Sequence, residues 1–335
     1  MRLVALVAAL VTLAPIVAHA MLSESAPWPA DGPDGIRVTA ASISPFTPAE
    51  IGSAPPATAQ LTYYPAVGAT ADNPAPAVVL LHGASGVRDG REGRTARAFA
   101  AQGVAAVVVD VFGARGGGGF QKRLLNITET MALADAFAAK AFLQATAEVD
   151  ASRTALIGFS YGGMSTIYAA YAQVVSAFDE APFAAHVAFY GPCIARFADP
   201  RTTGAPILMM WGDRDAIMDS NACLKLADDL RSGGSKVEVI RYDAAHRWDS
   251  VTGRRWHAPI HIAECAFTVD DSNVIRDDFS GLVMTGPAIR AAILALCASR
   301  DGYLIEPDAS VRQQSDAAMA RFLNPILFPK RMHKN

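Results

Sequence analysis

The chain has 335 residues, of which 51% are hydrophobic and 18% are charged, and its formal net charge is −3. This length and composition allow one large α/β domain or two small ones, and they exclude a chain that is disordered over most of its length. The body of the chain carries no basic patch or run, which argues against nucleic acid as a partner.

The first twenty residues have the pattern of a secretory signal peptide. Arg2 precedes an almost continuous apolar run over residues 3–17, and residues 18–20 (Ala-His-Ala) fit the small-x-small pattern of a cleavage site. We therefore predict cleavage after Ala20 and export to the periplasm or the medium, with a net charge of −3 − 1 = −4 for the mature chain. An uncleaved membrane anchor is the alternative. The apolar run is short for a spanning helix, so we expect no stable membrane insertion after cleavage.

Residues 21–35 are rich in proline, glycine and acidic side chains, which predicts a flexible leader without a strand or helix of its own. Residues 36–43 alternate loosely between apolar and polar side chains and are expected to form an edge strand. Residues 57–64 alternate more regularly, which predicts a second strand that ends at Pro65.

Between residues 77 and 242, short apolar runs alternate with helical patterns. Such runs are typical of strands that helices cover on both faces, and the alternation predicts an α/β fold with a doubly wound, mostly parallel sheet. No linker divides this part of the chain. The expected strands are residues 77–81, 104–109, 154–159, 184–190, 206–212 and 237–242, and the expected helices are residues 91–101, 129–145, 161–177 and 222–231.

Beyond residue 250 the periodic pattern weakens. Residues 251–308 are interpreted as a C-terminal elaboration that contains one helix over residues 288–298, and a closing helix is expected over residues 308–323. We therefore expect a single domain over residues 36–335.

The strongest chemical signal is the motif Gly-Phe-Ser-Tyr-Gly-Gly, which lies between a strand pattern and a helix pattern. Ser160 stands at its centre, with glycines at 158, 162 and 163. A tight strand-to-helix turn of this kind exposes the serine oxygen and points the helix N-terminus at negative charge that forms there. The alternative, a serine that caps a helix after a buried strand, accounts for the serine and for one glycine only.

A base and an acid follow this serine in the order Ser, Asp, His. Asp215 comes just after the expected strand 206–212, and His246 comes just after the strand 237–242. Because the carboxyl ends of parallel strands meet at one edge of a sheet, these groups are expected to converge. We predict His246 as the base and Asp215 as the carboxylate that orients it. Asp213 is the alternative acid.

Two backbone N–H groups are predicted to form an oxyanion hole. Tyr161 directly follows the nucleophile, and Ala84 lies in the loop after the first buried strand, with Gly83 as the next candidate. His82 precedes the serine in the chain and is expected to hold neighbouring loops together.

Four aromatic residues follow strand ends or flank these groups, and an apolar substrate pocket is predicted from Phe112 and Trp248, with Tyr161 as a further candidate. Trp211 is equally compatible with the core. No cofactor is expected. His257 and His261 have a spacing that could bind a metal on a helix, but the intervening Pro259 argues against a helix and therefore against a metal site.

The chain contains Cys193, Cys223, Cys265 and Cys297. An even number of cysteines in an exported protein favours disulfides over free thiols, and four cysteines allow three pairings. The spacing does not match a zinc site. Four reduced, buried cysteines are the alternative.

The segments HGASG, GFSYGG, WGDRD and YDAAHRWD together resemble the α/β-hydrolase fold, and more narrowly the dienelactone hydrolase-like family. The resemblance covers residues 58–330 and is strongest over residues 77–250. It implies the acid three residues after Gly212, which is Asp215, and the base in a Tyr-x-x-Ala-His setting, which is His246.

Dienelactone hydrolases use a cysteine nucleophile, whereas this chain has Ser160. The departure points to ester, thioester or amide substrates and away from lactone chemistry that is tuned to a thiolate. The resemblance also implies the disulfide pairing, because it brings the loops of Cys193 and Cys223 together and leaves Cys265 and Cys297 to pair in the elaboration.

The sequence thus predicts an exported serine hydrolase that cleaves a small-molecule ester or lactone-like substrate through an acyl-enzyme on Ser160. A prolyl-oligopeptidase-like peptidase is one alternative, since such enzymes share the Gly-x-Ser-Tyr-Gly-Gly motif. A non-catalytic binding protein with the same fold is the other. The oligomeric state and the identity of the substrate are left open.

Overall fold

The structure is a computed structural model that describes residues 21–25, 27–29, 31–251 and 253–329. The expected signal peptide, residues 1–20, lies outside the described residues. No helix within the described residues is long and apolar enough to cross a membrane.

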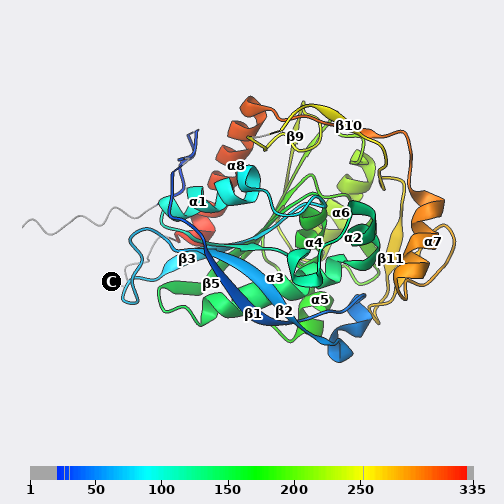
Figure 1. Cartoon of the computed structure of the whole chain (residues 1–335), viewed down its shortest axis with the longest axis horizontal. Coiled ribbons are helices and arrows are strands. Elements are labelled where there is room, and N and C mark those ends of the chain that lie inside the picture. Colours follow the sequence, from blue (N-terminus) through cyan, green and yellow to red (C-terminus); the bar gives the residue numbers. More distant parts are fainter. Residues whose placement is uncertain (1–20, 26, 30, 252, 330–335) are drawn as a thin grey trace, which may run out of the picture.

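A central sheet of eight strands, in the order β1-β2-β4-β3-β5-β6-β8-β9, forms the body of the protein (Figure 1). The pairs β1–β2 and β2–β4 are antiparallel and the other pairs are parallel, which confirms the expected doubly wound, mostly parallel arrangement. The strands are β1 (Ile36–Ile43), β2 (Pro56–Tyr64), β3 (Ala75–Leu81), β4 (Ala105–Val109), β5 (Val149–Phe159), β6 (Ala185–Phe189), β8 (Ile207–Gly212) and β9 (Val237–Tyr242).

The interior strands are apolar because both of their faces are covered. Every residue of β3, β4, β6 and β8 is buried, as expected for parallel strands between two layers of helices. In the register of the sheet, Leu81 lies beside Val109 and Gly158. The carboxyl ends of β3, β4 and β5 therefore meet at the same edge, where the loops that follow them gather.

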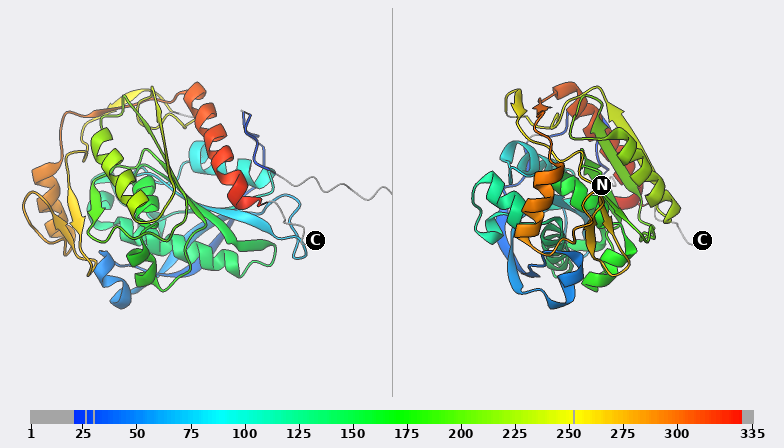
Figure 2. Two further views of the ribbon diagram at one scale, coloured as in Figure 1. Left: turned by 180° about the vertical axis from the view of Figure 1, so that it is seen from behind. Right: turned by 90° about the vertical axis from the view of Figure 1, so that its right-hand side faces the viewer.

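Helices cover both faces of the sheet (Figures 1 and 2). The chain passes from β3 to β4 in one direction and from β4 to β5 and β6 in the other, so right-handed crossovers place α1 on the face opposite α3 and α4. The helices are α1 (Arg94–Ala101), α2 (Phe120–Asn126), α3 (Glu129–Gln144), α4 (Tyr161–Tyr168), α5 (Ala172–Phe178), α6 (Ser220–Ser232), α7 (Pro287–Cys297) and α8 (Ala309–Leu327), with short turns η1 (Pro48–Ser53), η2 (Asp89–Gly93) and η3 (Gly113–Arg115). The single helix expected over residues 161–177 is divided into α4 and α5.

The expected C-terminal elaboration forms α7 and most of two small sheets at one end of the molecule, to which the body of the chain contributes β7. One sheet has the order β12-β11-β7 and the other pairs β10 with β13. In the right-hand view of Figure 2, α7 (orange) stands in front of the central sheet. The strands are β7 (Ala195–Phe197), β10 (Trp256–Ala258), β11 (Phe267–Val269), β12 (Ile275–Asp277) and β13 (Tyr303–Ile305).

The described part of the expected leader, residues 21–25, 27–29 and 31–35, contains no strand or helix, as predicted, but it is anchored to the domain and is not the loose segment that was expected. Leu22 and Trp28 are buried. The backbone N–H of Leu22 donates to Oδ1 of Asn324 at 2.8 Å, and the Trp28 ring lies edge-on to Phe99 at 5.0 Å. Burying a large apolar side chain stabilises a fold by about 1.5–3 kcal/mol, so two such anchors fix a segment whose composition alone suggests mobility.

Candidate active site

Ser160 sits at the sharp turn between β5 and α4, with φ 55° and ψ −112°. This is a left-handed backbone conformation that non-glycine residues rarely adopt. The backbone N–H of Ser160 donates to the carbonyl oxygen of Phe189 at 2.9 Å, and the N–H of Met164 donates to the carbonyl oxygen of Ser160 at 2.9 Å. The turn is therefore held from the neighbouring strand on one side and by the first turn of α4 on the other.

The three glycines of the motif are required by close backbone approaches. A Cβ atom at Gly158 would lie 2.0 Å from the carbonyl oxygen of Gly162, and one at Gly162 would lie 2.4 Å from the carbonyl oxygen of Leu81. A Cβ atom at Gly163 would lie 2.7 Å from the carbonyl oxygen of Phe189. Gly158 thus lets α4 pack directly on β5, and Gly162 and Gly163 let β3 and β6 lie against the start of α4, which explains why the sequence contains three glycines here.

The structure brings Ser160, His246 and Asp215 together at the carboxyl edge of the sheet. Nε2 of His246 lies 3.1 Å from Oγ of Ser160, and Nδ1 of His246 lies 2.6 Å from Oδ2 of Asp215. The carboxylate of Asp215 is buried, and its Oδ1 accepts a hydrogen bond from the backbone N–H of Ile217 at 3.2 Å. Because the carboxylate faces Nδ1, that nitrogen carries the proton of the neutral imidazole and Nε2 can accept one from the serine.

The C-terminal elaboration fixes the position of His246. Its backbone N–H donates to the carbonyl oxygen of Leu304 at 3.1 Å, and its own carbonyl oxygen accepts from the N–H of Glu306 at 3.0 Å. Edge-on contacts with Tyr190 and Tyr303 hold the imidazole ring, at centroid distances of 4.6 and 5.2 Å. Burial raises the pKa of Tyr303 to about 12, and the carboxylate of Asp215 acts in the same direction. Neither tyrosine is predicted from the sequence as a residue of the site.

Asp213, the alternative acid, lies away from this chain of hydrogen bonds. Its carboxylate pairs with Arg241 on the surface at 2.6 Å. His82 is fully buried, with Nδ1 2.8 Å from the carbonyl oxygen of Gly83, and its Nε2 accepts from the backbone N–H of Val111 at 3.2 Å. It links the loops after β3 and β4, as expected for a structural histidine.

The backbone N–H groups of Tyr161 and Ala84 lie beside the serine. Both residues, like Ser160, line the same cavity. Within the described residues, neither N–H donates a hydrogen bond to the protein. Tyr161 is the first residue of α4, where the helix leaves its N–H groups without partners inside the helix. Two residues that line the cavity together with Ser160 therefore have backbone N–H groups without a partner in the described part of the protein.

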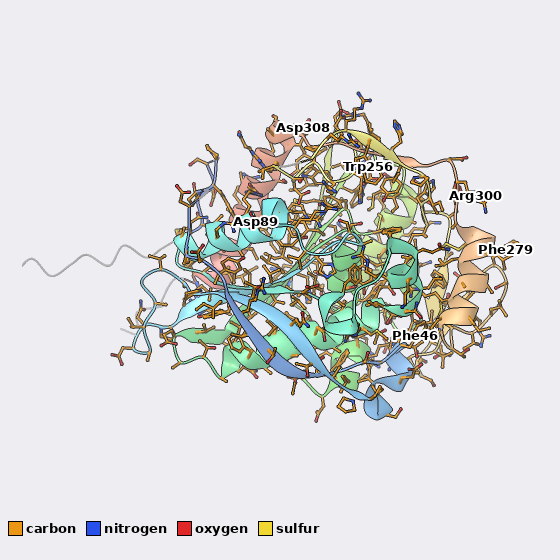
Figure 3. All side chains as sticks on the ribbon, viewed as in Figure 1. Phe46, Asp89, Trp256, Phe279, Arg300 and Asp308 are labelled. Atoms are coloured by element: carbon orange, nitrogen blue, oxygen red, sulfur yellow. A yellow bond between two sulfur atoms is a disulfide. The ribbon has the colours of Figure 1, made fainter. Side chains whose placement is uncertain are left out.

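The cavity above Ser160 has a volume of about 560 Å³. Its walls come from α2, from residues 260–262, and from α7 with the residues that follow it. Arg300 stands at the α7 end of this wall (Figure 3). The glycine run 116–119 leads directly into α2, but none of its residues lines the cavity. The contribution of α7 has no signal in the local sequence pattern.

The predicted pocket residues Phe112 and Trp248 do not line this cavity, so their prediction as substrate-binding residues is wrong. Phe112 is buried and its ring lies against His82, at a centroid distance of 4.5 Å. Trp248 is fully buried, and its Nε1 donates to Oγ of Ser315 at 3.1 Å. Arg247, with φ 67°, turns the backbone so that Trp248 points into the core.

The structure contains the disulfides Cys193–Cys223 and Cys265–Cys297, the pairing that the resemblance implied. The second disulfide joins the end of α7, which lines the cavity, to Cys265, which follows the cavity-lining residues 260–262 by three positions. The disulfide therefore fixes one wall of the cavity against another. The structure contains no free cysteine within its described residues.

Trp211, which suits either the core or the pocket, is a core residue. It is fully buried and its Nε1 donates to Oγ of Ser220 at 3.1 Å. His257 lies on the exposed strand β10, whereas His261 is buried and lines the cavity. The described part of the chain holds no cluster of three or more His, Cys, Asp or Glu side chains suited to a metal ion.

Comparison with known proteins places this geometry in context. Residues 64–254 match the model of the dienelactone hydrolase family. A dienelactone hydrolase-like promiscuous phosphotriesterase from metagenomic libraries is similar in structure, with a TM-score of 0.52 and 18% identity over 88% of this chain and 99% of that chain. A thermophilic esterase from Thermogutta terrifontis matches with a TM-score of 0.46 and 18% identity, over 58% of this chain and 80% of that chain. No curated protein sequence matches the chain.

Proposed function

The chain belongs to the dienelactone hydrolase family and has the α/β-hydrolase fold, and we propose that it is an exported serine hydrolase that cleaves carboxylic esters through an acyl-enzyme on Ser160. The observation that carries the proposal is the hydrogen-bonded chain from Ser160 through His246 to Asp215, which opens into a cavity of about 560 Å³. The substrate is a small-molecule ester, and catalysis needs no cofactor.

In the first half of the reaction, Oγ of Ser160 attacks the ester carbonyl carbon while Nε2 of His246 accepts the hydroxyl proton. Asp215 stabilises the imidazolium that forms. The N–H groups of Tyr161 and Ala84 donate to the oxyanion, and losing one such donor costs about 3 kcal/mol of transition-state stabilisation. His246 then protonates the leaving alcohol. A water molecule attacks the acyl-enzyme and gives its proton to His246, which releases the acid and restores the serine.

A serine nucleophile in place of the cysteine of dienelactone hydrolases suits an oxidising compartment. A thiolate that is exposed to such a compartment is prone to irreversible oxidation, whereas an alcohol is not. Two disulfides in the structure are in keeping with the same environment. The protein therefore hydrolyses ordinary esters and has a nucleophile and cross-links that are stable in an oxidising compartment.

A fluorophosphonate probe tests the assignment of the nucleophile. The wild-type protein is expected to be labelled at Ser160, and the Ser160→Ala and His246→Ala variants are expected to lose both labelling and hydrolysis of p-nitrophenyl acetate. Ser176→Ala, an exposed serine on α5, is the matched control and should react like the wild type. A wild-type protein that is not labelled favours the non-catalytic binding protein. Faster cleavage of an aminoacyl amide than of any ester favours the peptidase.

We also propose that the mature chain begins at Met21 and folds as one domain, with Leu22 and Trp28 packed onto it. Expression with the complete N-terminus in a Gram-negative host, followed by N-terminal sequencing of the periplasmic fraction, tests the first part. A protein that keeps residues 1–20 and sediments with membranes would contradict it. A single cooperative unfolding transition is expected for one domain.

A further inference from the structure

A second cavity, which the proposed reaction does not use, lies next to the catalytic cavity. It has a volume of about 60 Å³ and is lined by residues of α3, α4, α5, β7, β11 and α7, with neighbouring segments. Val174, Phe197 and Phe267 are among its lining residues, and all three are buried in the protein. In contrast to the catalytic cavity, this inner cavity does not include Ser160 in its lining.

The inner cavity and the catalytic cavity share part of their lining. Five residues line both cavities, and four of them carry flexible apolar side chains. Met164 follows Ser160 by one helical turn along α4, so its side chain lies on the same side of the helix as the nucleophile. A change of rotamer in these side chains would join the two cavities. The shared residues are Leu124, Glu129, Met164, Ile262 and Leu294.

The two charged side chains in the wall of the inner cavity, Arg290 and Glu129, form an ion pair with each other. Arg290 donates to both carboxylate oxygens of Glu129, at 2.9 and 3.0 Å, and its Nε donates to the carbonyl oxygen of Leu124 at 2.9 Å. Burial by itself would raise the pKa of Glu129, but the guanidinium of Arg290 outweighs burial and holds it below its ordinary value. The pair is thus ionised and neutral overall, and it leaves no unpaired charge for a ligand. This lining suits a hydrocarbon better than a polar group.

We infer that the inner cavity is a subsite for a hydrocarbon chain of the ester whose carbonyl group reacts at Ser160, reached past Met164 and Leu294. The inference rests on the proposed function. A water-sized sphere occupies roughly 10–15 Å³ of such volume, so the subsite holds on the order of four to six chain atoms. Each methylene that enters it is worth about 0.8 kcal/mol, or about fourfold in kcat/KM.

Two series of linear esters test this inference. One varies the acyl chain from acetate to dodecanoate with a constant p-nitrophenol leaving group, and the other varies the alcohol with a constant acetyl group. In one series kcat/KM should rise about fourfold per methylene over roughly four carbons and then level off, and the series that responds identifies which side of the ester occupies the subsite. Flat profiles in both series overturn the inference.

Substitutions in the lining of the inner cavity test whether the chain-length preference arises there. Val174→Phe fills the inner cavity and should reduce the ratio of kcat/KM between the octanoyl and acetyl esters, or between the corresponding alcohols, by at least about tenfold. Met284→Ala enlarges the same cavity and should move the plateau to longer chains. Val175→Phe is the matched control, since it is a buried neighbour on α5 that lines neither cavity, and it should keep the wild-type ratio. Near-ultraviolet circular dichroism checks that each variant is folded.

A binding measurement separates failure of this inference from failure of the proposed function. If hydrolysis depends on Ser160 but Val174→Phe and Met284→Ala keep the wild-type chain-length profile, the subsite is wrong and the function stands. If no ester is hydrolysed, calorimetry with octanoate and octanol on the Ser160→Ala protein decides the question of the subsite alone. Binding of either ligand that Val174→Phe weakens at least tenfold supports it, and the same affinity in both backgrounds overturns it.

Discussion

Acidification is expected to destabilise this protein through one histidine in the middle of its central sheet. His186 lies in β6 and is fully buried. Among the residues that the structure describes, neither of its ring nitrogens makes a hydrogen bond of good geometry, and the polar group that acts on the ring is the backbone of Thr166. Burial lowers its pKa from 6.5 to about 4; the Thr166 backbone opposes this shift, and the ammonium group of Lys140 adds to it. The side chain is therefore neutral in the folded protein at neutral pH.

The direction of the pH dependence follows from the difference in the pKa of His186 between the folded and unfolded states. The unfolded chain takes up a proton near pH 6.5 and the folded protein only near pH 4, so protons bind preferentially to the unfolded state between these values. The contribution of His186 to the free energy of unfolding is fully present above about pH 6.5 and is lost as the pH falls toward 4. A shift of about 2.5 units at 1.36 kcal/mol each corresponds to about 3 kcal/mol from this one group.

Urea unfolding of the wild type and of His186→Leu at pH 7 and pH 4 measures this contribution. Leucine has no titratable group and a similar volume, so the variant should stay within about 1.5 kcal/mol of the wild type at pH 7. It should lose about 3 kcal/mol less than the wild type on acidification, because the carboxylates that titrate in both proteins cancel in the comparison. His257→Leu, at an exposed position, is the control and should follow the wild type.

Equal losses of free energy in the wild type and in His186→Leu would refute this reasoning. Such a result would mean that His186 is protonated in the folded protein or that the sheet opens locally to admit water around it. A variant that is less stable than the wild type by several kcal/mol at pH 7 would show instead that the ring nitrogens make contacts that stabilise the fold.

Three further outcomes are expected. Asp215→Asn should lower kcat for an acetate ester by about 10⁴-fold, since the amide stabilises the wrong histidine tautomer, whereas Asp213→Asn, which breaks only a surface ion pair, should stay within about twofold of the wild type. Replacing Cys265 and Cys297 by serine should destabilise the protein by up to about 4 kcal/mol in chemical unfolding, from the 32-residue separation that the disulfide closes, and equal stability with and without reductant would contradict this. Gly162→Ala should lower the melting temperature or the yield of folded protein sharply, because its Cβ would lie 2.4 Å from a backbone oxygen, and a normal melting curve would show that β3 can move away.

The sequence predicts the residues at the carboxyl edge of the sheet well because their signals are local. Apolar runs locate the strands, and the residues just after them converge by the geometry of a parallel sheet. β1 (Ile36–Ile43) lies where it was predicted, and the three glycines around Ser160 correspond to three close backbone contacts. The same argument places Asp215 and His246 within hydrogen-bond distance of each other, although 31 residues separate them in the chain.

Such local patterns do not predict the direction in which a side chain at a strand end points. Trp248 follows His246 by two residues and looks like part of a pocket, yet the left-handed conformation of Arg247 turns it into the core against α8. Leu22 and Trp28 pack onto the domain although their segment has the composition of a loose leader. In each case one backbone angle or one long-range contact decides whether the side chain is buried in the core. Neither of these produces a periodic pattern in the sequence.

The wall of the catalytic cavity that α7 forms, called the roof below, is the part that depends most on long-range contacts. α7 reaches its place through the disulfide to Cys265 and through Arg290, whose partner Glu129 lies 161 residues earlier in the chain. These two links hold α7 beside α2 and α3 without the continuous apolar pattern that places a strand. The positions of the proposed triad residues are therefore set by the sheet edge, whereas the shape of the cavity beside them is set by cross-links onto it. Changes at the roof should consequently alter which ester is preferred while the hydrogen-bonded chain at Ser160 stays in place.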